Sequence, residues 1–180
     1  MRPLSADQRP WLFLDIDGVI NSTWRSVRND RAYQLTGFAD YQTCQAGGFT
    51  IAYSPSVVER ILSLDANVVW ATTWITVPEA LEELIAELGI TDDLPRLTKV
   101  KPRSATACGK AEGIKRWLAD DDRPFVWIDD DIGSEDHELC IDHGYDCLLV
   151  VPDRDLGITA GELEQIEQFV KLSMIQADNC

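Results

Sequence analysis

The sequence predicts an α/β domain with a mainly parallel sheet that carries helices on both faces. Two observations support this prediction: four short apolar runs, and segments of helical periodicity between them. The runs are continuous and do not alternate with polar residues, as expected for strands that are covered on both faces. Because strands alternate with helices along the chain, neighbouring strands are expected to be parallel. The runs cover residues 11–16, 68–72, 125–128 and 147–151.

The predicted helices are marked by apolar spacing and by end signals. Ser54 is a candidate N-cap for the first of them, and Gly89 follows the second as a stop signal. Thr159 and Glu162 form a capping-box pattern that opens a C-terminal helix. The three helices before it are expected over residues 55–64, 78–88 and 111–118.

A length of 180 residues fits a single domain over residues 1–180, without internal repeats or linkers. No apolar run approaches the roughly 20 residues of a membrane-spanning helix, so no membrane partner is expected. Residues 21–53 are polar and contain glycine, and are predicted to form a loop or hairpin. This segment follows the carboxyl end of the first strand, where ligands bind in open α/β sheets.

The net charge of −15 limits the partners of this protein. A field of that sign repels nucleic acids and anionic membranes, because affinity for polyanions depends on lysine and arginine. It also repels phosphorylated small molecules. Any phosphate site in this chain therefore needs its own local positive charge.

The cysteines indicate a reducing compartment. They are odd in number and form no C-x-x-C pair, so neither a disulfide framework nor a zinc site is expected. The N-terminus also lacks the order of basic and apolar residues that is typical of a signal peptide. We therefore expect a cytoplasmic protein. The cysteines are Cys44, Cys108, Cys140, Cys147 and Cys180.

Two carboxylates and a glycine at the end of the first apolar run give the strongest functional signal. Asp15 and Asp17 are two residues apart, so strand geometry would place them on one face. Gly18 allows a sharp turn and a close approach of backbone N–H groups to a ligand. The alternatives are a turn that simply ends the strand and a calcium-binding loop, but the residues after Gly18 lack the further ligands of a calcium loop.

A second acidic cluster, Asp129 and Asp130, follows the third apolar run. In a parallel sheet, both clusters emerge at the same edge. Like charges about 4 Å apart repel by roughly 4 kcal/mol at an effective dielectric constant of 20, so converging carboxylates require a cation. Hard oxygen ligands without histidine or cysteine favour Mg²⁺. A solvated acidic loop is the alternative for this cluster taken alone.

Hydroxyl and ammonium groups that suit a phosphate lie elsewhere in the chain. Thr72 and Thr73 follow the second strand, and either hydroxyl has the chemistry to bind a phosphoryl oxygen. Lys110 lies at the start of a helix, where a positive charge is unfavourable unless an anion is nearby. Other basic residues close in sequence compete for this role: Lys99, Lys101 and Arg103.

The order of these motifs resembles the haloacid dehalogenase-like (HAD) phosphatase superfamily. Asp-x-Asp-Gly comes first, then a threonine at a strand end, a lysine at a helix start, and an Asp-Asp pair at a strand end. The sequence around these motifs is similar to that of a small-cap HAD branch, which is related to domains of RNA-repair proteins. The resemblance implies a Rossmann-like HAD fold with a minimal cap.

The resemblance also implies a mechanism. Asp15 would attack phosphorus to form an aspartyl-phosphate, and Asp17 would act as general acid and then as general base. Thr72 and Lys110 would bind phosphoryl oxygens. Mg²⁺ would be held by four residues: Asp15, Asp17 through its carbonyl, Asp130, and Asp129 directly or indirectly.

In this superfamily, insertions over the site select the substrate. The segment 21–53 is too short for a helical cap domain, so it is interpreted as a short flap over an open site. Arg25 is a candidate for binding a second anionic group of the substrate, as are Arg28 and Arg31, unless they are solvated loop charges. Trp24 and Trp74 are candidates for stacking on a ring.

Three functions follow from these predictions. The first is a Mg²⁺-dependent phosphomonoesterase that acts on a small phosphorylated metabolite or nucleotide. The second is a phosphatase of polynucleotide ends, which the RNA-repair relatives favour and the net charge disfavours. The third is a non-catalytic domain that binds phosphoryl groups or metal. Retention of Asp17 argues against the third.

Overall fold

Four parallel strands form the central sheet. They are β1 (Trp11–Leu14), β4 (Asn67–Trp70), β5 (Phe125–Ile128) and β6 (Cys147–Val150). Their order in the sheet is β4-β1-β5-β6, so the first strand lies inside the sheet. Leu14 of β1 is level with Trp70 of β4 and Ile128 of β5. The structure, a computed structural model, describes residues 8–22, 34–91, 93–98, 100, 109–142 and 146–177.

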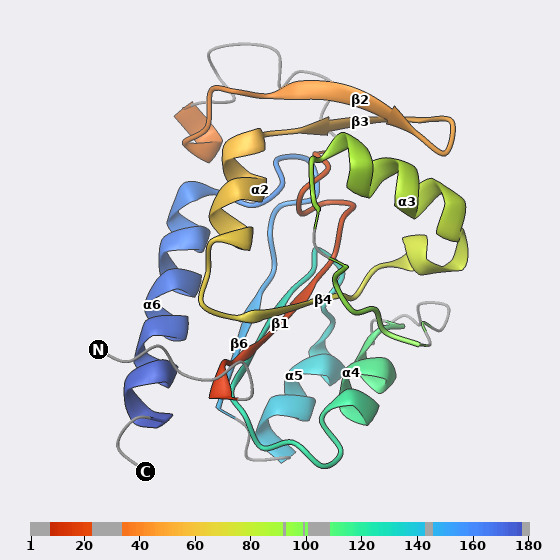
Figure 1. Ribbon diagram of the computed structural model, residues 1–180. Helices are drawn as coiled ribbons and strands as arrows, with labels where there is room; N and C mark the ends of the chain where they lie inside the picture. Colours follow the sequence, from red (N-terminus) through yellow and green to blue (C-terminus); the bar gives the residue numbers. More distant parts are fainter. Residues whose placement is uncertain are drawn as a thin grey trace.

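Helices cover both faces of this sheet (Figure 1). They are α2 (Pro55–Leu62), α3 (Pro78–Glu87), α4 (Ala111–Trp117), α5 (Ser134–Asp142) and α6 (Ala160–Ala177). In Figure 1, α2 and α6 lie on one side of the strands, and α4 and α5 lie on the other. This arrangement confirms the predicted Rossmann-like α/β fold. None of the described helices is both long and apolar enough to cross a membrane.

The two faces of β1 belong to two separate hydrophobic cores. Leu12 and Leu14 pack in one core with Ile61 of α2. Phe13 points to the opposite face and packs in the other core with Ile114 of α4. All five side chains are almost completely buried. The continuous apolar sequence of β1 is therefore explained by burial on both sides.

The first strand ends two residues earlier than its apolar run predicts. The chain turns at Ile16, whose carbonyl oxygen accepts backbone hydrogen bonds from three residues: Val19, Ile20 and Asn21. The chain thus leaves the sheet shortly after Leu14, the last residue of β1 that is paired with β4 and β5. Strand β4 also stops early, at Trp70, because the chain continues into a short 3₁₀ helix, η2 (Thr73–Thr76).

The predicted starts of two helices are confirmed by side-chain caps. The Ser54 hydroxyl accepts a hydrogen bond from the Val57 N–H at 3.3 Å and caps α2. The Thr159 N–H donates to the Glu162 carboxylate at 2.7 Å, and the Glu162 N–H donates to the Thr159 hydroxyl at 3.3 Å. These reciprocal bonds form a capping box.

An antiparallel hairpin occupies the described end of the segment 21–53. Its strands are β2 (Gln42–Ala46) and β3 (Phe49–Tyr53). Figure 1 shows the hairpin lying across the end of the molecule, above the loop that follows β1 and beside α3. The Ser22 N–H donates to the Ala52 carbonyl at 2.9 Å, which ties β3 to that loop. The hairpin therefore lies at the edge of the sheet where the functional residues were predicted.

One prediction from the cysteines is wrong. Cys140 of α5 and Cys147 of β6 form a disulfide bond. A spacing of seven residues gave no recognised motif, and only the fold of α5 back onto β6 brings the two sulfur atoms together. The disulfide also removes the argument for a reducing compartment that rested on unpaired cysteines.

Candidate active site

The site is built at the carboxyl ends of two neighbouring strands. Because Leu14 and Ile128 are paired in register, the next residues, Asp15 and Asp129, leave β1 and β5 at the same level. The Asp15 N–H still donates to the Ile128 carbonyl at 3.0 Å, which fixes the backbone of Asp15 against β5. The sheet register thus brings the two predicted acidic clusters together.

A buried lysine bridges these two carboxylates. Lys110 precedes α4, and its Nζ donates to Asp15 Oδ2 and, at 2.7 Å, to Asp129 Oδ2. The other oxygen of Asp15 accepts the Ile16 N–H at 2.7 Å. Lys110 is only 4% exposed, Asp15 4% and Asp129 0%. Charges this deeply buried persist in a fold only when they are paired, so the three groups depend on one another.

Burial and charge shift the ionisation of these groups in competing directions. Burial raises the pKa of Asp15 to about 7, because the loss of water outweighs the attraction of Lys110, and Asp129 adds a like charge. Burial also raises the pKa of Asp129. Burial opposes the charge on Lys110, but the two carboxylates more than compensate and raise its pKa above the ordinary value. Lys110 therefore stays charged.

Asp15, Asp129 and Asp130 could together hold a metal ion. One carboxylate oxygen from each lies within 4.8 Å of the others. Three hard oxygen donors without nitrogen or sulfur suit Mg²⁺. Both Asp129 oxygens already accept hydrogen bonds, one from Lys110 and the other from the Asp131 N–H at 3.0 Å. Both Asp15 oxygens accept hydrogen bonds as well, from Lys110 and from the Ile16 N–H, so all three carboxylates are candidate ligands, and the donor set fits a magnesium ion.

Gly18 brings the loop after β1 against Asp130. Its φ of 71° lies in the left-handed region, and a Cβ atom there would be 2.4 Å from Asp130 Cγ. No side chain fits at this position, so glycine is required both by conformation and by space. The Gly18 N–H donates to the Asn21 carbonyl at 2.8 Å, a bond within the turn after β1.

Arg154 is a site residue that the sequence analysis missed. It lies between β6 and α6, and its Nε donates to Asp130 Oδ2. Its guanidinium group also lies 3.7 Å from Asp131, and 58% of its side chain is exposed. A single arginine in a loop carries no motif, so only the fold reveals this contact.

Asp17 has different partners from Asp15. Its two oxygens accept hydrogen bonds from Trp74 Nε1 and from Asn21 Nδ2, each at 2.8 Å. Asp17 lies beyond the end of β1, so strand alternation does not set the direction of its side chain. Trp74 was predicted as a stacking residue, and Asn21 was not singled out.

The two threonine candidates differ in their surroundings. Thr72 is fully buried, and its hydroxyl accepts a hydrogen bond from the Trp74 N–H at 3.3 Å. No described group accepts the hydroxyl proton of Thr72, so its O–H can still donate a hydrogen bond to a ligand. Thr73 is exposed to solvent on η2. The structure thus favours Thr72 as the threonine that is held in a fixed position.

Several predicted residues lie outside the part of the chain that the structure describes. Arg25, the candidate for a second anionic group, is among them. The others are Trp24, Arg28 and Arg31 in the flap segment, and the alternatives to Lys110, namely Lys99, Lys101 and Arg103.

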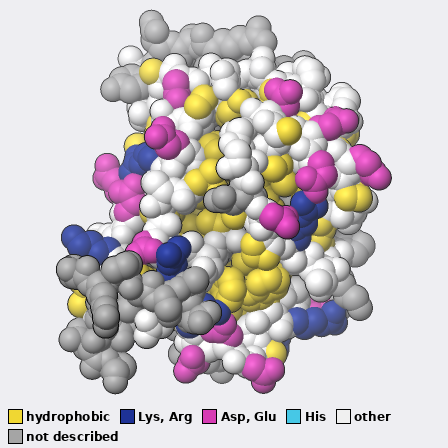
Figure 2. All heavy atoms as spheres, viewed as in Figure 1, with side chains coloured by type: hydrophobic (Ala, Val, Ile, Leu, Met, Phe, Trp, Pro, Cys, Tyr) yellow, Lys and Arg dark blue, Asp and Glu magenta, His cyan; other side chains and the backbone are white. Residues whose placement is uncertain are grey.

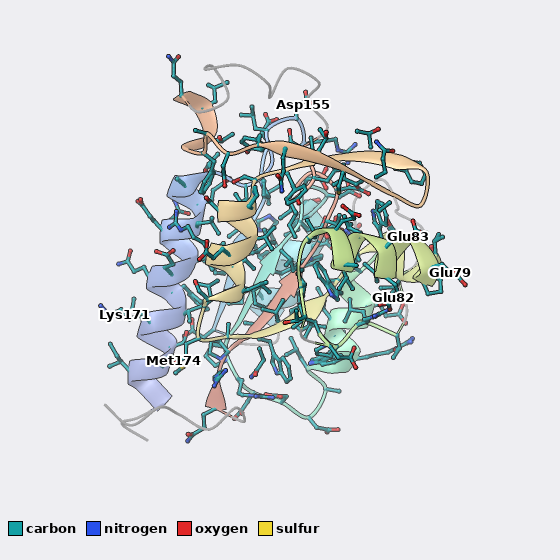
Figure 3. All side chains as sticks on the ribbon, turned by 45° about the horizontal axis from the view of Figure 1, so that its top comes forward. Glu79, Glu82, Glu83, Asp155, Lys171 and Met174 are labelled. Atoms are coloured by element: carbon teal, nitrogen blue, oxygen red, sulfur yellow. A yellow bond between two sulfur atoms is a disulfide. The ribbon has the colours of Figure 1, made fainter. Side chains whose placement is uncertain are left out.

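The surface beside the hairpin is acidic. Figure 2 shows acidic side chains gathered over the α3 side of one face, and Figure 3 labels three that project from this helix. They are Glu79, Glu82 and Glu83, all exposed. Glu83 accepts a hydrogen bond from the Gly47 N–H of the hairpin turn at 2.8 Å, so the acidic surface continues to the flap.

A comparison with protein families supports the interpretation of the motifs. Residues 11–163 match the model of a family described as the HAD domain in Swiss Army Knife RNA repair proteins. The matched range includes β1, β4, β5, β6 and every residue of the site described above. No match was found among curated proteins or among solved structures. The resemblance predicted from the sequence is confirmed.

Proposed function

Because the chain belongs to the HAD domain family of Swiss Army Knife RNA repair proteins, we propose that it is a Mg²⁺-dependent phosphomonoesterase with Asp15 as nucleophile. One observation carries this proposal above the others. Lys110 is buried between Asp15 and Asp129, with Asp130 close enough to share a cation. A fold gains little stability from such a cluster, whereas phosphoryl transfer needs a nucleophile surrounded by positive charge.

Asp15, Asp130 and the carbonyl of Asp17 are the proposed ligands of Mg²⁺. Asp129 acts mainly through Lys110, which it holds beside Asp15. The ion, when bound, neutralises charge on the phosphoryl oxygens. Arg154 contacts Asp130 from the solvent side and would have to share this carboxylate with the ion.

In the first step, an oxygen of Asp15 forms a bond to phosphorus while the bond from phosphorus to the substrate oxygen breaks. The leaving oxygen takes a proton from the Asp17 carboxyl group and departs as an alcohol. Lys110 and the Thr72 hydroxyl donate hydrogen bonds to the phosphoryl oxygens, where negative charge is concentrated. Thr73 and Arg25 remain candidates for contacts outside this core.

In the second step, the Asp17 carboxylate removes a proton from water. The water oxygen then bonds to phosphorus, and the bond from phosphorus to Asp15 breaks. Inorganic phosphate is released, Asp15 is a free carboxylate again, and Asp17 is protonated for the next cycle. The residue that gave a proton in the first step thus recovers one in the second.

The substrate we propose is a small phosphorylated metabolite or nucleotide. The net charge of −15 and the exposed acidic residues of α3 repel a polyanion at the flap. The second candidate is a phosphorylated polynucleotide end, which the family description favours. A panel of nucleotides, sugar phosphates and phosphorylated oligonucleotides separates the two by their kcat/KM values.

Replacement of the nucleophile tests the proposal. We expect Asp15→Asn to abolish hydrolysis of an aryl phosphate in Mg²⁺, because an amide oxygen does not form the acyl phosphate. EDTA should abolish the activity of the native protein, and added Mg²⁺ should restore it. Asp93→Asn, at an exposed position, is the matched control and should keep full activity. Full turnover by Asp15→Asn would refute the proposed mechanism.

A further inference from the structure

Two side chains hold the Asp17 carboxylate, one from the same loop and one from the distant helix η2. Trp74 Nε1 donates to one oxygen at 2.8 Å, and Asn21 Nδ2 donates to the other at 2.8 Å. With one donor on each oxygen, rotation of the carboxyl group about its terminal bond would break at least one hydrogen bond. The group is thus held in a single orientation.

Asn21 joins Asp17 to the hairpin. Its amide oxygen accepts the Ala52 N–H of β3 at 3.0 Å, while its amide nitrogen serves Asp17. Asn21 is only 9% exposed. One side chain therefore uses its acceptor for the flap and its donor for the proposed general acid.

Trp74 is held by the hairpin as well. Its ring packs edge-to-face against Phe49 of β3, with the ring centroids 5.9 Å apart. Its backbone N–H donates to the Thr72 hydroxyl, and the residue is 9% exposed. A tryptophan fixed at both backbone and ring presents its indole N–H in one direction, toward Asp17.

We propose that Trp74 and Asn21 are positioning residues, which hold the Asp17 carboxyl group where it meets the leaving oxygen of the substrate. This inference rests on the proposed function of Asp17 as general acid. Proton transfer requires a donor and an acceptor within hydrogen-bond distance, so orientation of the acid sets the rate of this step. Both residues act through Asp17, whose oxygens they contact.

The dependence of rate on the leaving group tests this role. An aryl phosphate such as p-nitrophenyl phosphate leaves as a stable anion and needs little protonation. An alkyl phosphate such as glycerol phosphate leaves as a basic alkoxide and depends on the acid. The value of kcat/KM reports formation of the aspartyl-phosphate and excludes the later attack of water, so it isolates the acid role of Asp17.

Trp74→Phe removes the indole N–H and keeps an aromatic ring against Phe49. We expect kcat/KM for the alkyl phosphate to fall about 10- to 100-fold, within the contribution of general acid catalysis. The fall for the aryl phosphate should be less than about threefold, because this substrate bypasses that contribution. Trp117→Phe is the matched control, because Trp117 packs on Trp11 on the far side of the sheet from α2. This change should alter kcat/KM for the two substrates by the same factor, if at all.

Asn21→Asp provides a second, independent variant. It keeps an acceptor for the Ala52 N–H but replaces the N–H donor by a carboxylate that repels Asp17. The same selective loss on the alkyl phosphate is expected, including in the case that Trp74→Phe does not fold. Equal losses on both substrates, or no loss, in the variants that fold would overturn the inference. That result, with an inactive Asp15→Asn, would leave the proposed function intact, whereas an active Asp15→Asn would refute the proposed function itself.

Discussion

At the scale of single residues, Lys110 connects the fold to the proposed chemistry. It is the described cation that lies between Asp15 and Asp129, and all three groups are buried. A buried ion cluster of this kind is a poor source of stability, but removal of one member is costly because the others lose their compensating charge. The same positive charge lies where a phosphoryl group would bind.

We predict that Lys110→Met lowers both stability and activity. Loss of the ammonium group leaves two buried carboxylates without their cation, at a cost of about 3–5 kcal/mol in the free energy of unfolding. Urea unfolding would measure this loss, and phosphatase assays at saturating Mg²⁺ should show little turnover. Lys115→Met, on the exposed face of α4, is the control and should change neither quantity. An active, fully stable Lys110→Met protein would contradict the role given to this lysine.

At the scale of elements, the loop after β1 is shaped by its contact with the loop after β5. Gly18 lies against Asp130, so the two acidic segments pack without an intervening side chain. The position of Asp130 thus depends on a residue of the loop after β1. Gly89 provides a comparison, because it has the same φ of 71° but nothing within 4 Å of its missing Cβ.

We predict that Gly18→Ala is more harmful than Gly89→Ala. Both changes place a side chain in the left-handed region, at a cost of about 1 kcal/mol or more. Only Gly18→Ala also forces Asp130 to move. Thermal unfolding should show the larger loss for Gly18→Ala, and calorimetric titration with Mg²⁺ should show weakened binding in this variant alone. Equal effects of the two changes would mean that the contact with Asp130 is unimportant.

A pair of charged residues before β5, Asp121 and Arg123, contacts the start of β1. Asp121 accepts hydrogen bonds from Trp11 Nε1 and from Arg123 Nε, each at 2.9 Å. The guanidinium group of Arg123 also lies 4.2 Å from the Trp11 ring centroid. The hydrogen bonds from Arg123 lower the pKa of Asp121 from 3.8 to about 2.

A lowered pKa means that ionised Asp121 stabilises the fold above the unfolded pKa, and that this stabilisation is lost as the pH falls toward the folded value. We therefore predict that Asp121→Asn lowers the free energy of unfolding by about 1–2 kcal/mol at pH 7. The difference from the native protein should narrow as the pH falls from about 4 toward 2, in urea titrations. Asp120→Asn, at an exposed neighbour, should have little effect. A difference that does not vary with pH would contradict the account of this contact.

At the scale of the whole molecule, the sequence predicted most of what depends on local pattern. The four strands were visible because each is apolar on both faces, and the helix caps were visible at Ser54 and Thr159. The acidic clusters were expected to meet because parallel strands share one carboxyl edge. Asp15, Asp129 and Asp130 do meet there.

What the sequence did not predict depends on contacts between distant segments. Arg154 reaches Asp130 from the loop before α6, and Asn21 joins Asp17 to the hairpin; neither contact has a local signature. The disulfide of Cys140 and Cys147 likewise requires α5 to fold back onto β6. The role of a single polar residue in a loop depends on which distant residues the fold places beside it. An isolated residue forms no sequence motif, so its role cannot be recognised from the sequence.

Covalent capture of the intermediate tests the central claim most directly. Asp17→Asn lacks the base for the second step, so with p-nitrophenyl phosphate and Mg²⁺ it should accumulate a phosphorylated enzyme. Rapid acid quenching, intact-mass measurement and peptide mapping would locate the group. We predict one phosphoryl group per chain, on Asp15. A phosphoryl group on another residue, or hydrolysis with Asp15 unmodified throughout, would contradict the claim.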